Sequence, residues 1–194
     1  DMIFNSLSKI HKEVEENFPF KCITVDRAEA DDIIGVLAKH FHSNEKIMIV
    51  SNDKDFQQLQ RYTNVSQYSP LKKKMLVCEN PERFLLEHII KGDSGDGIPN
   101  LLSDDDVFVT EGKRQKACGQ KKMDELYRDL DEWAKTANWD RNNQMINLNC
   151  VPSYIEEKIL SEYGKETTYD QGKVLSYFVT NRLKNLMENI QEFV

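Results

Sequence analysis

Short apolar segments alternate with amphipathic ones over residues 20–59, and this alternation restricts the possible folds more than any other feature. Residues 20–25 and 47–50 are rich in β-branched side chains, which favours strands. Residues 29–41 between them carry apolar side chains at helical spacing, and a short helix over 56–59 follows. A strand–helix–strand unit of this length predicts parallel, neighbouring strands joined by a right-handed crossover. The predicted fold class is therefore α/β with a mostly parallel sheet.

The rest of the chain is predicted to be mainly helical. Helices are predicted over residues 5–16, 81–91, 122–137, 152–163 and 172–193, and short strands over 65–68 and 75–78. Asn80 and Pro81 support the helix that follows them, because Asn caps a helix and Pro at the first position loses no needed N–H. The helix at 5–16 and the strands at 20–25 and 46–51 are expected to bury one another.

Composition excludes several classes of protein. No apolar run approaches the roughly 18 residues that a membrane span needs, and no signal peptide is visible. The four cysteines form no closely spaced pair, which argues against a zinc site or a disulfide framework. The sequence also lacks a recognisable motif for a serine or cysteine nucleophile. We therefore expect a cytoplasmic protein that has no membrane partner.

Acidic side chains form three compact groups at the ends of predicted elements. The groups are Glu29, Asp31 and Asp32, then Asp53 and Asp55, then Asp93 and Asp96. The first two groups follow predicted strands, whose carboxyl ends border the functional crevice of an open α/β sheet. Carboxylates packed together repel one another, and a hard divalent cation with oxygen ligands would relieve that repulsion. Two such ions could activate a water and stabilise the leaving oxygen in phosphodiester hydrolysis.

Each acidic group also has an ordinary structural explanation. The helix dipole favours acids at helix N-termini, which suits residues 29–32. An Asp-x-Asp turn after a strand and the Gly-Asp-Ser-Gly-Asp sequence at 92–96 are both common in loops. The presence of all three groups on one such scaffold favours a metal site. Residues 104–106, by contrast, are interpreted as a solvated acidic loop.

Three segments resemble the core of the 5′-nuclease, or flap-endonuclease, superfamily. They are Ala28-Glu29-Ala30-Asp31-Asp32-Ile33, Ser51 to Leu59, and Lys91-Gly92-Asp93-Ser94-Gly95-Asp96-Gly97-Ile98-Pro99-Asn100. Residues 62–74, 175–179 and 189–193 are similar to the ribonuclease H branch of T-even-type phages. The resemblance implies a PIN-like, metal-binding nuclease core over 1–92. It also implies a helical, duplex-binding domain over 93–194 that contains a helix–three-turn–helix-like element.

The resemblance further implies a two-metal 5′-3′ nuclease of phage DNA replication, which removes RNA primers from RNA–DNA hybrids and trims 5′ DNA ends or flaps. Two Mg²⁺ ions, replaceable by Mn²⁺, would bind Glu29, Asp31, Asp32, Asp53, Asp55, Asp93 and Asp96. The catalytic residues among them would be Asp31, Asp53 and Asp55. Its nucleic-acid partner would be a hybrid, a 5′ flap or a nicked duplex. Its protein partners would be a single-stranded-DNA-binding protein and a sliding clamp, and the chain is expected to be a monomer.

Two basic clusters are the expected nucleic-acid-binding surface, although the net charge is −7. They comprise Lys72, Lys73, Lys74, Lys113, Arg114, Lys116, Lys121 and Lys122. Such side chains neutralise phosphates and position a duplex without reading its sequence. The local clusters of basic residues therefore say more about nucleic-acid binding than the net charge does.

Two alternatives stay open from the sequence. A PIN-type ribonuclease shares the sheet and an acidic cluster, although the loop at 92–100 and the helical C-terminal third count against it. A non-catalytic fragment that binds DNA structures is the other, because Asp1 in place of Met indicates a piece of a longer protein. The superfamily's first strand, with its own metal-binding Asp, and most of the arch would precede residue 1. The 194-residue chain alone is therefore expected to be catalytically weak or inactive.

Overall fold

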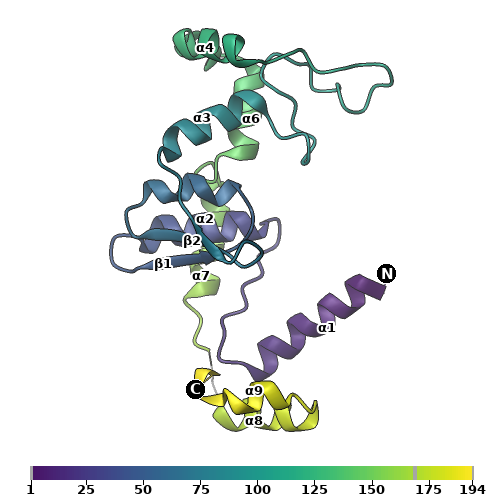
Figure 1. The fold of residues 1–194 in the computed structure, drawn as a ribbon, viewed down its shortest axis with the longest axis vertical. Coiled ribbons are helices and arrows are strands. Elements are labelled where there is room, and N and C mark those ends of the chain that lie inside the picture. Colours follow the sequence, from purple (N-terminus) through teal and green to yellow (C-terminus); the bar gives the residue numbers. More distant parts are fainter. Residues whose placement is uncertain (1, 168–169, 194) are drawn as a thin grey trace. The chain divides into compact units, whose positions relative to one another are not determined.

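The computed structural model describes residues 2–167 and 170–193, and the chain divides into two compact units. The first unit comprises residues 1–26 and 157–194, and the second comprises residues 27–156. Helix α7 (Ser153–Tyr163) contains the boundary between them. Figure 1 shows the elements of both units. In the part of the chain that the structure describes, no helix is long and apolar enough to span a bilayer.

The sheet of the second unit has the order β1–β2–β3 among the described residues. Strand β1 (Ile47–Val50) pairs in parallel with β2 (Val65–Ser69), and β3 (Lys74–Leu76) pairs antiparallel with β2. In the parallel pair, Ile47 lies opposite Val65 and Val50 lies opposite Tyr68. The α/β fold class is confirmed, and so are the three strands predicted between residues 47 and 78, with small shifts of their ends. The sheet is mixed rather than mostly parallel among the described residues, because β3 pairs antiparallel with β2.

One side of this sheet carries the main core. Helix α2 (Ala30–Phe41) and the 3-10 helix η1 (Asp55–Arg61) pack against its strands. The core consists of Ala38, Ile49, Phe56, Leu59, Val65 and Leu148. Fully buried Gln58 anchors η1, because its Nε2 donates to the carbonyl of Ile146 and its Oε1 accepts from the amide of Leu148, both at 3.0 Å. These two bonds hold η1 to residues 146–148.

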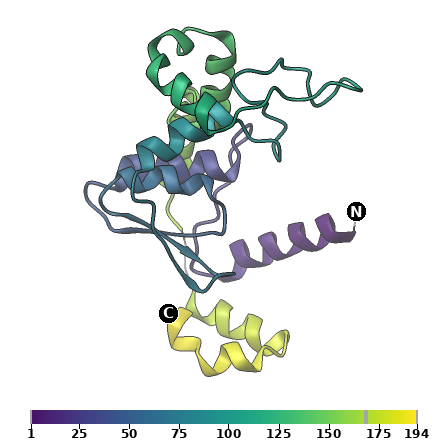
Figure 2. The ribbon, with the colours of Figure 1, turned by 45° about the horizontal axis from the view of Figure 1, so that its top comes forward.

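Helix α3 (Pro81–Lys91) connects the sheet layer to a helical layer. It begins at Asn80, whose side-chain oxygen accepts a hydrogen bond from the amide of Arg83 at 2.9 Å. It contacts η1, α4 (Gln120–Arg128) and α6 (Ala137–Ile146), and Figures 1 and 2 show it alongside α6. The predicted helix at 81–91 and its cap are therefore confirmed.

The loop after α3 turns sharply and is held against α6. Gly92 ends the helix at φ +67° and ψ −174°, a region that is essentially restricted to glycine. A Cβ there would lie 2.4 Å from the carbonyl oxygen of Ile98. Buried Asn142 of α6 donates to the carbonyl oxygen of Pro99 at 2.9 Å. The loop therefore folds back, and Asp93 forms an isolated bridge with Ile98.

The first unit is built around aromatic side chains. Its elements besides the end of α7 are α1 (Met2–Asn17), α8 (Gln171–Thr180), α9 (Lys184–Glu188) and the 3-10 helix η2 (Ile190–Phe193). Fully buried Phe178 lies 5.8 Å from Phe18 and 5.2 Å from Phe193, measured between ring centroids. The hydroxyl of Tyr177 donates to Glu13 at 2.8 Å, which joins α8 to α1.

Residues 20–25, predicted as a strand, form an irregular segment that pairs with no strand among the described residues. A strand needs a partner as well as β-branched side chains, and the regular elements of the first unit are helices. Lys21 instead donates to the carbonyl of Lys165 at 2.8 Å. The predicted pairing of this segment with residues 46–51 is wrong. The expected mutual burial with the first helix is also wrong, because α1 contains no buried residue.

The helical third is more interrupted than predicted. The helix expected over 122–137 ends at Arg128, and the short helix α5 (Leu130–Trp133) follows it. Helix α6 was not predicted, because its polar, Asn-rich sequence has low helix propensity and gains stability from burial of Asn142 and Ile146. The helix expected over 172–193 is broken near Arg182, whose φ is +56°.

We expect Gly92→Ala to lower the free energy of unfolding far more than Gly97→Ala. Both glycines have positive φ, which costs about 1–2 kcal/mol for other residues. A Cβ at Gly92 would also collide with backbone, an overpacking cost of about 1–3 kcal/mol, whereas nothing lies within 4 Å of one at Gly97. Urea unfolding of the two variants measures the difference. Equal losses of stability would contradict this account of the loop.

Candidate metal centre

A cleft of about 420 Å³ in the second unit gathers five of the predicted carboxylates. It is lined by Glu29, Asp31, Asp53, Asp55 and Asp96, with Ala30, Ile34, Val50, Ser51 and Phe56 beside them. The acids come from three segments: the start of α2, the turn after β1 and the loop after α3. The cleft lies at the carboxyl end of β1, where the sequence predicted that the acidic groups would meet.

The first acidic group is divided between the cleft and the helix. Glu29 is the N-cap of α2, and its amide donates to Oδ2 of Asp32 at 3.0 Å. Asp32 therefore satisfies a free N–H group at the helix start, which is the ordinary role of such an acid. Asp31 lies beside it and faces the cleft. Glu29 and Asp31 thus line the cleft, whereas the carboxylate of Asp32 is engaged in the cap of α2.

Hydrogen bonds shape the turn that carries the second group. The amide of Asp53 donates to Oγ of Ser51 at 3.1 Å, and Oδ1 of Asp53 accepts from the amide of Asp55 at 3.0 Å. Fully buried Gln67 in β2 donates to the carbonyl oxygens of Ser51 at 3.0 Å and Asp53 at 2.6 Å. The neighbouring strand therefore fixes the backbone from which both carboxylates project.

A buried histidine lies between the second and third groups. His88 of α3 places Nε2 3.0 Å from Oδ2 of Asp93 and Nδ1 3.4 Å from Oδ1 of Asp55. Asp93 also pairs with Nζ of Lys54 at 2.7 Å and accepts from the amide of Gly95 at 2.9 Å. Burial alone would raise the pKa of Asp93, but hydrogen bonds from Lys54, His88 and Gly95 outweigh it and lower that pKa to about 2.

Sequence reasoning missed His88 and Lys54. The available signal was the position of His88 between Leu85 and Ile89, on the side of α3 that a core-facing helix buries. Asp93 does not line the cleft, and its oxygens contact Lys54, His88 and the amide of Gly95 instead. Of the two acids of the third group, Asp96 reaches the cleft.

The charges in the cleft fit a divalent cation. Burial raises the pKa of Asp31, and the charges of Asp32 and Asp53 add to this against opposing backbone hydrogen bonds. Burial also raises the pKa of Asp55, where the attraction of His88 opposes it and the charge of Asp53 reinforces it. Oδ1 of Asp55 is buried without a hydrogen-bond partner among the described residues. Mg²⁺ and similar ions prefer carboxylate oxygens as ligands, and such an ion would compensate the negative charges of these acids.

The predicted basic residues lie outside this cleft. Lys72, Lys73 and Lys74 are exposed at the turn between β2 and β3. Arg114, Lys116 and Lys121 are exposed in the irregular segment before α4 and at its start. Lys113 pairs with Asp106 at 2.7 Å and Lys122 pairs with Glu125 at 3.0 Å. These two lysines would have to exchange a carboxylate for a phosphate, and the binding role of the whole set stays a prediction.

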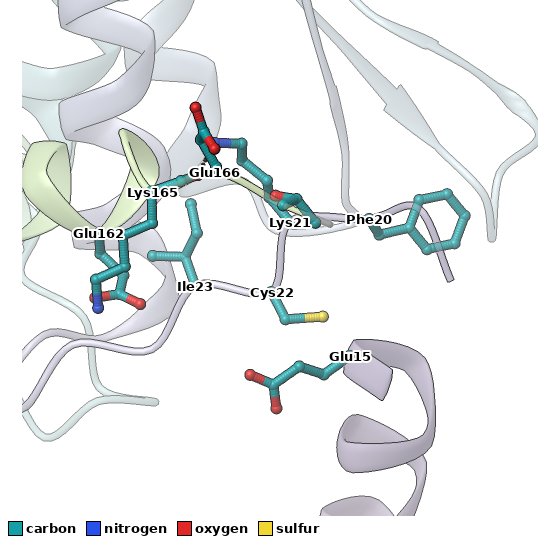
Figure 3. A pocket seen from close by; sticks show the side chains of 9 residues that line it. Glu15, Phe20, Lys21, Cys22, Ile23, Glu162, Lys165 and Glu166 are labelled. Atoms are coloured by element: carbon teal, nitrogen blue, oxygen red, sulfur yellow. Dashed lines mark hydrogen bonds and ion pairs between the residues drawn. The ribbon is translucent and has the colours of Figure 1, made fainter. Parts of the chain in front are cut away.

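A second cavity, of about 280 Å³, lies in the first unit (Figure 3). The picture shows the thiol of Cys22 directed toward Glu15, with Lys21, Glu162 and Lys165 also at the wall. Burial raises the pKa of Cys22, and the charge of Glu15 raises it further. The thiol therefore stays protonated and is a poor nucleophile. This cavity does not carry the chemistry that the acidic cleft offers.

Comparison with known families decides the affiliation of the chain. Residues 3–86 match the family described as 5′-3′ exonuclease, N-terminal resolvase-like domain, and residues 79–193 match the one described as T4 RNase H, C terminal. The chain belongs to the T4 RNase H family. This match over the C-terminal part favours that family over the PIN-type ribonucleases.

Individual relatives agree with this affiliation. Ribonuclease H of Enterobacteria phage T4 is 31% identical over 202 residues, which cover 98% of this chain and 66% of that protein. DNA polymerase I of Rhizobium leguminosarum is 33% identical over 99 residues, 46% of this chain and 10% of that protein. The chain therefore spans about two thirds of the length of the phage relative.

Two solved structures share the fold. One is a T5 protein co-crystallized with metal ions, with a TM-score of 0.57 and 20% identity, covering 93% of this chain and 68% of that one. The other is a mutant of the T5 5′-exonuclease, with a TM-score of 0.55 and 20% identity, covering 94% of this chain and 75% of that one. At this identity the likeness concerns the fold alone.

We expect Mg²⁺ or Mn²⁺ to stabilise the chain against unfolding and Asp31→Asn to weaken that effect. An ion at 100 times its dissociation constant adds about 2.7 kcal/mol to the free energy of unfolding. The variant removes one ligand charge, so its metal-free form should melt at a higher temperature and gain less from the ion. Thermal melts in EDTA and in Mg²⁺ measure both effects. Glu111→Gln, which removes an exposed charge outside the cleft, is the control and should leave the gain unchanged.

Proposed function

We propose that the chain carries the metal centre of a 5′-3′ nuclease that hydrolyses phosphodiester bonds in nucleic acid. The observation that carries the proposal is the meeting of five carboxylates from three segments in one cleft of a chain of this family. Clustered, partly buried acids are costly without a cation, and a divalent ion would relieve that cost. Binding alone would not require such a cluster.

The residues divide into ligands and supports. Glu29, Asp31, Asp53, Asp55 and Asp96 would hold two Mg²⁺ ions, for which Mn²⁺ is expected to substitute. When bound, such ions lower the pKa of a coordinated water and stabilise the leaving oxygen. Asp32 and Asp93 would support this set, because the cap of α2 and the contacts with Lys54 and His88 occupy their oxygens.

The substrate proposed for this centre is an RNA–DNA hybrid, a 5′ flap or a nicked duplex, as the likeness to phage T4 ribonuclease H suggests. Residues 93–194 would contact the duplex, and residues 1–92 would supply most of the metal centre. We further propose that the protein acts as a monomer in the host cytoplasm during phage DNA replication. A single-stranded-DNA-binding protein and a sliding clamp would be its partners there.

Asp53→Asn should lower cleavage of a 5′ flap by at least about a hundredfold while leaving binding of the flap largely intact. The substitution removes a ligand charge at nearly constant shape, and small errors in position cost about this much in rate. Cleavage in Mg²⁺ and binding in Ca²⁺ by fluorescence anisotropy separate the two effects. The control, Asp104→Asn, alters an exposed acid outside the cleft. A parent chain that binds flaps but cleaves none would support the non-catalytic alternative.

Replacing Lys121 and Lys122 by Ala should weaken the dependence of flap binding on salt. Each phosphate neutralised on B-DNA contributes about −0.9 to the slope of log K against log salt, so the slope should flatten by about two units at most. The loss should come mainly from Lys121, since Lys122 already pairs with Glu125. Binding titrations at several salt concentrations measure the slope. An unchanged slope would place the duplex elsewhere.

A further inference from the structure

The imidazole of His88 spans two acidic segments that are separate in the sequence. Its side chain is 7% exposed, and its two ring nitrogens face different carboxylates. Nε2 lies 3.0 Å from Oδ2 of Asp93 in the loop after α3, whereas Nδ1 lies 3.4 Å from Oδ1 of Asp55 in η1. With an N–H on each nitrogen, the rigid ring can donate to both carboxylates at once.

The contact with Asp55 is incomplete as it stands. Nδ1 of His88 and Oδ1 of Asp55 are both buried and have no hydrogen-bond partner among the described residues. A buried polar group without a partner is destabilising, and these two atoms lie 3.4 Å apart. A small rotation of the Asp55 carboxylate would complete the hydrogen bond and fix which oxygen faces the cleft.

Both carboxylate oxygens of Asp93 already have partners. Lys54 and His88 share Oδ2, and the amide of Gly95 donates to Oδ1. Lys54 reaches Asp93 from the surface, with a side chain that is 58% exposed, so it cannot replace the buried imidazole. Packing fixes the ring itself, since Leu85 and Ile89 of the same helix turn are buried and Phe84 lies edge-on to it at 5.9 Å.

We propose that His88 is a positioning residue, which bridges Asp55 and Asp93 and thereby orients Asp55 toward the metal cleft. His88 does not line that cleft, although one of its ring nitrogens and one oxygen each of Asp55 and Asp93 lie within 4.8 Å of one another and could themselves hold an ion. In this proposal His88 orients Asp55 and does not coordinate the ion. The proposal rests on the proposed function to the extent that Asp55 is a ligand. Residues that orient metal ligands through hydrogen bonds contribute to affinity without touching the ion. Metal affinity therefore tests the proposal independently of cleavage.

Two substitutions at position 88 separate the two hydrogen bonds. His88→Leu removes both at similar volume, while His88→Gln keeps one amide that can donate to Asp93. We expect His88→Leu to weaken Mn²⁺ binding by about 10- to 100-fold, in line with other residues that orient ligands, and His88→Gln to lie between it and the parent. Isothermal titration in the full 194-residue chain gives affinity and stoichiometry. Thermal melts in EDTA report folding separately.

The matched control is Ile89→Val, a buried neighbour on the same helix. It should lower the melting temperature slightly and leave Mn²⁺ affinity unchanged. An Mn²⁺ affinity in His88→Leu equal to that of the parent would overturn the proposal. The loss of one bound ion per chain in both variants would also overturn it, because His88 would then be a ligand. If His88→Leu does not fold, His88→Gln decides the question by the same criterion. A parent chain that binds Mn²⁺ but cleaves no hybrid or flap would support the non-catalytic alternative and leave this comparison valid.

Discussion

Mutual repulsion of the carboxylates in the cleft is the constraint on which the rest of the second unit depends. Asp31 and Asp55 are partly buried, and the charge of Asp53 acts on both. A chain can hold such groups together only if their backbone is fixed by stronger contacts than the repulsion. Buried Gln67 meets this condition at the turn after β1, where it binds the carbonyl oxygens of Ser51 and Asp53. Buried Gln58 holds η1 by binding the backbone of Ile146 and Leu148.

The predictable part of the fold is the part that local contacts determine. Apolar spacing sufficed for α2 and β1, and the Asn80-Pro81 pair sufficed for the start of α3. The acids of the cleft could be predicted for the same reason, because each lies at the end of such an element. The segment 20–25 failed because β-branched residues form a strand only beside another strand, which local sequence does not report.

Contacts between distant segments explain why the sequence did not predict the surroundings of His88, Asp32 and Asp93. His88 follows the pattern of a core position, and its role appears only when η1 and the loop after α3 approach α3 from two sides. Asp32 and Asp93 share the sequence motifs of the cleft acids, yet hydrogen bonds turn their carboxylates to other partners. The motifs therefore identified the acidic residues, while their division into those that line the cleft and those bound elsewhere required the three-dimensional contacts.

The position of Asp96, in the loop after α3, also depends on contacts with a distant part of the chain. Asp96 reaches the cleft because the chain reverses at Gly92, where a side chain would meet the carbonyl of Ile98. The reversal in turn requires a partner for the carbonyl of Pro99, and Asn142 of α6 supplies it from a position 43 residues away. Helix α6 is weak by local propensity, so it forms through this packing. The packing of α6 against the loop therefore supports the position of Asp96 in the acidic cleft.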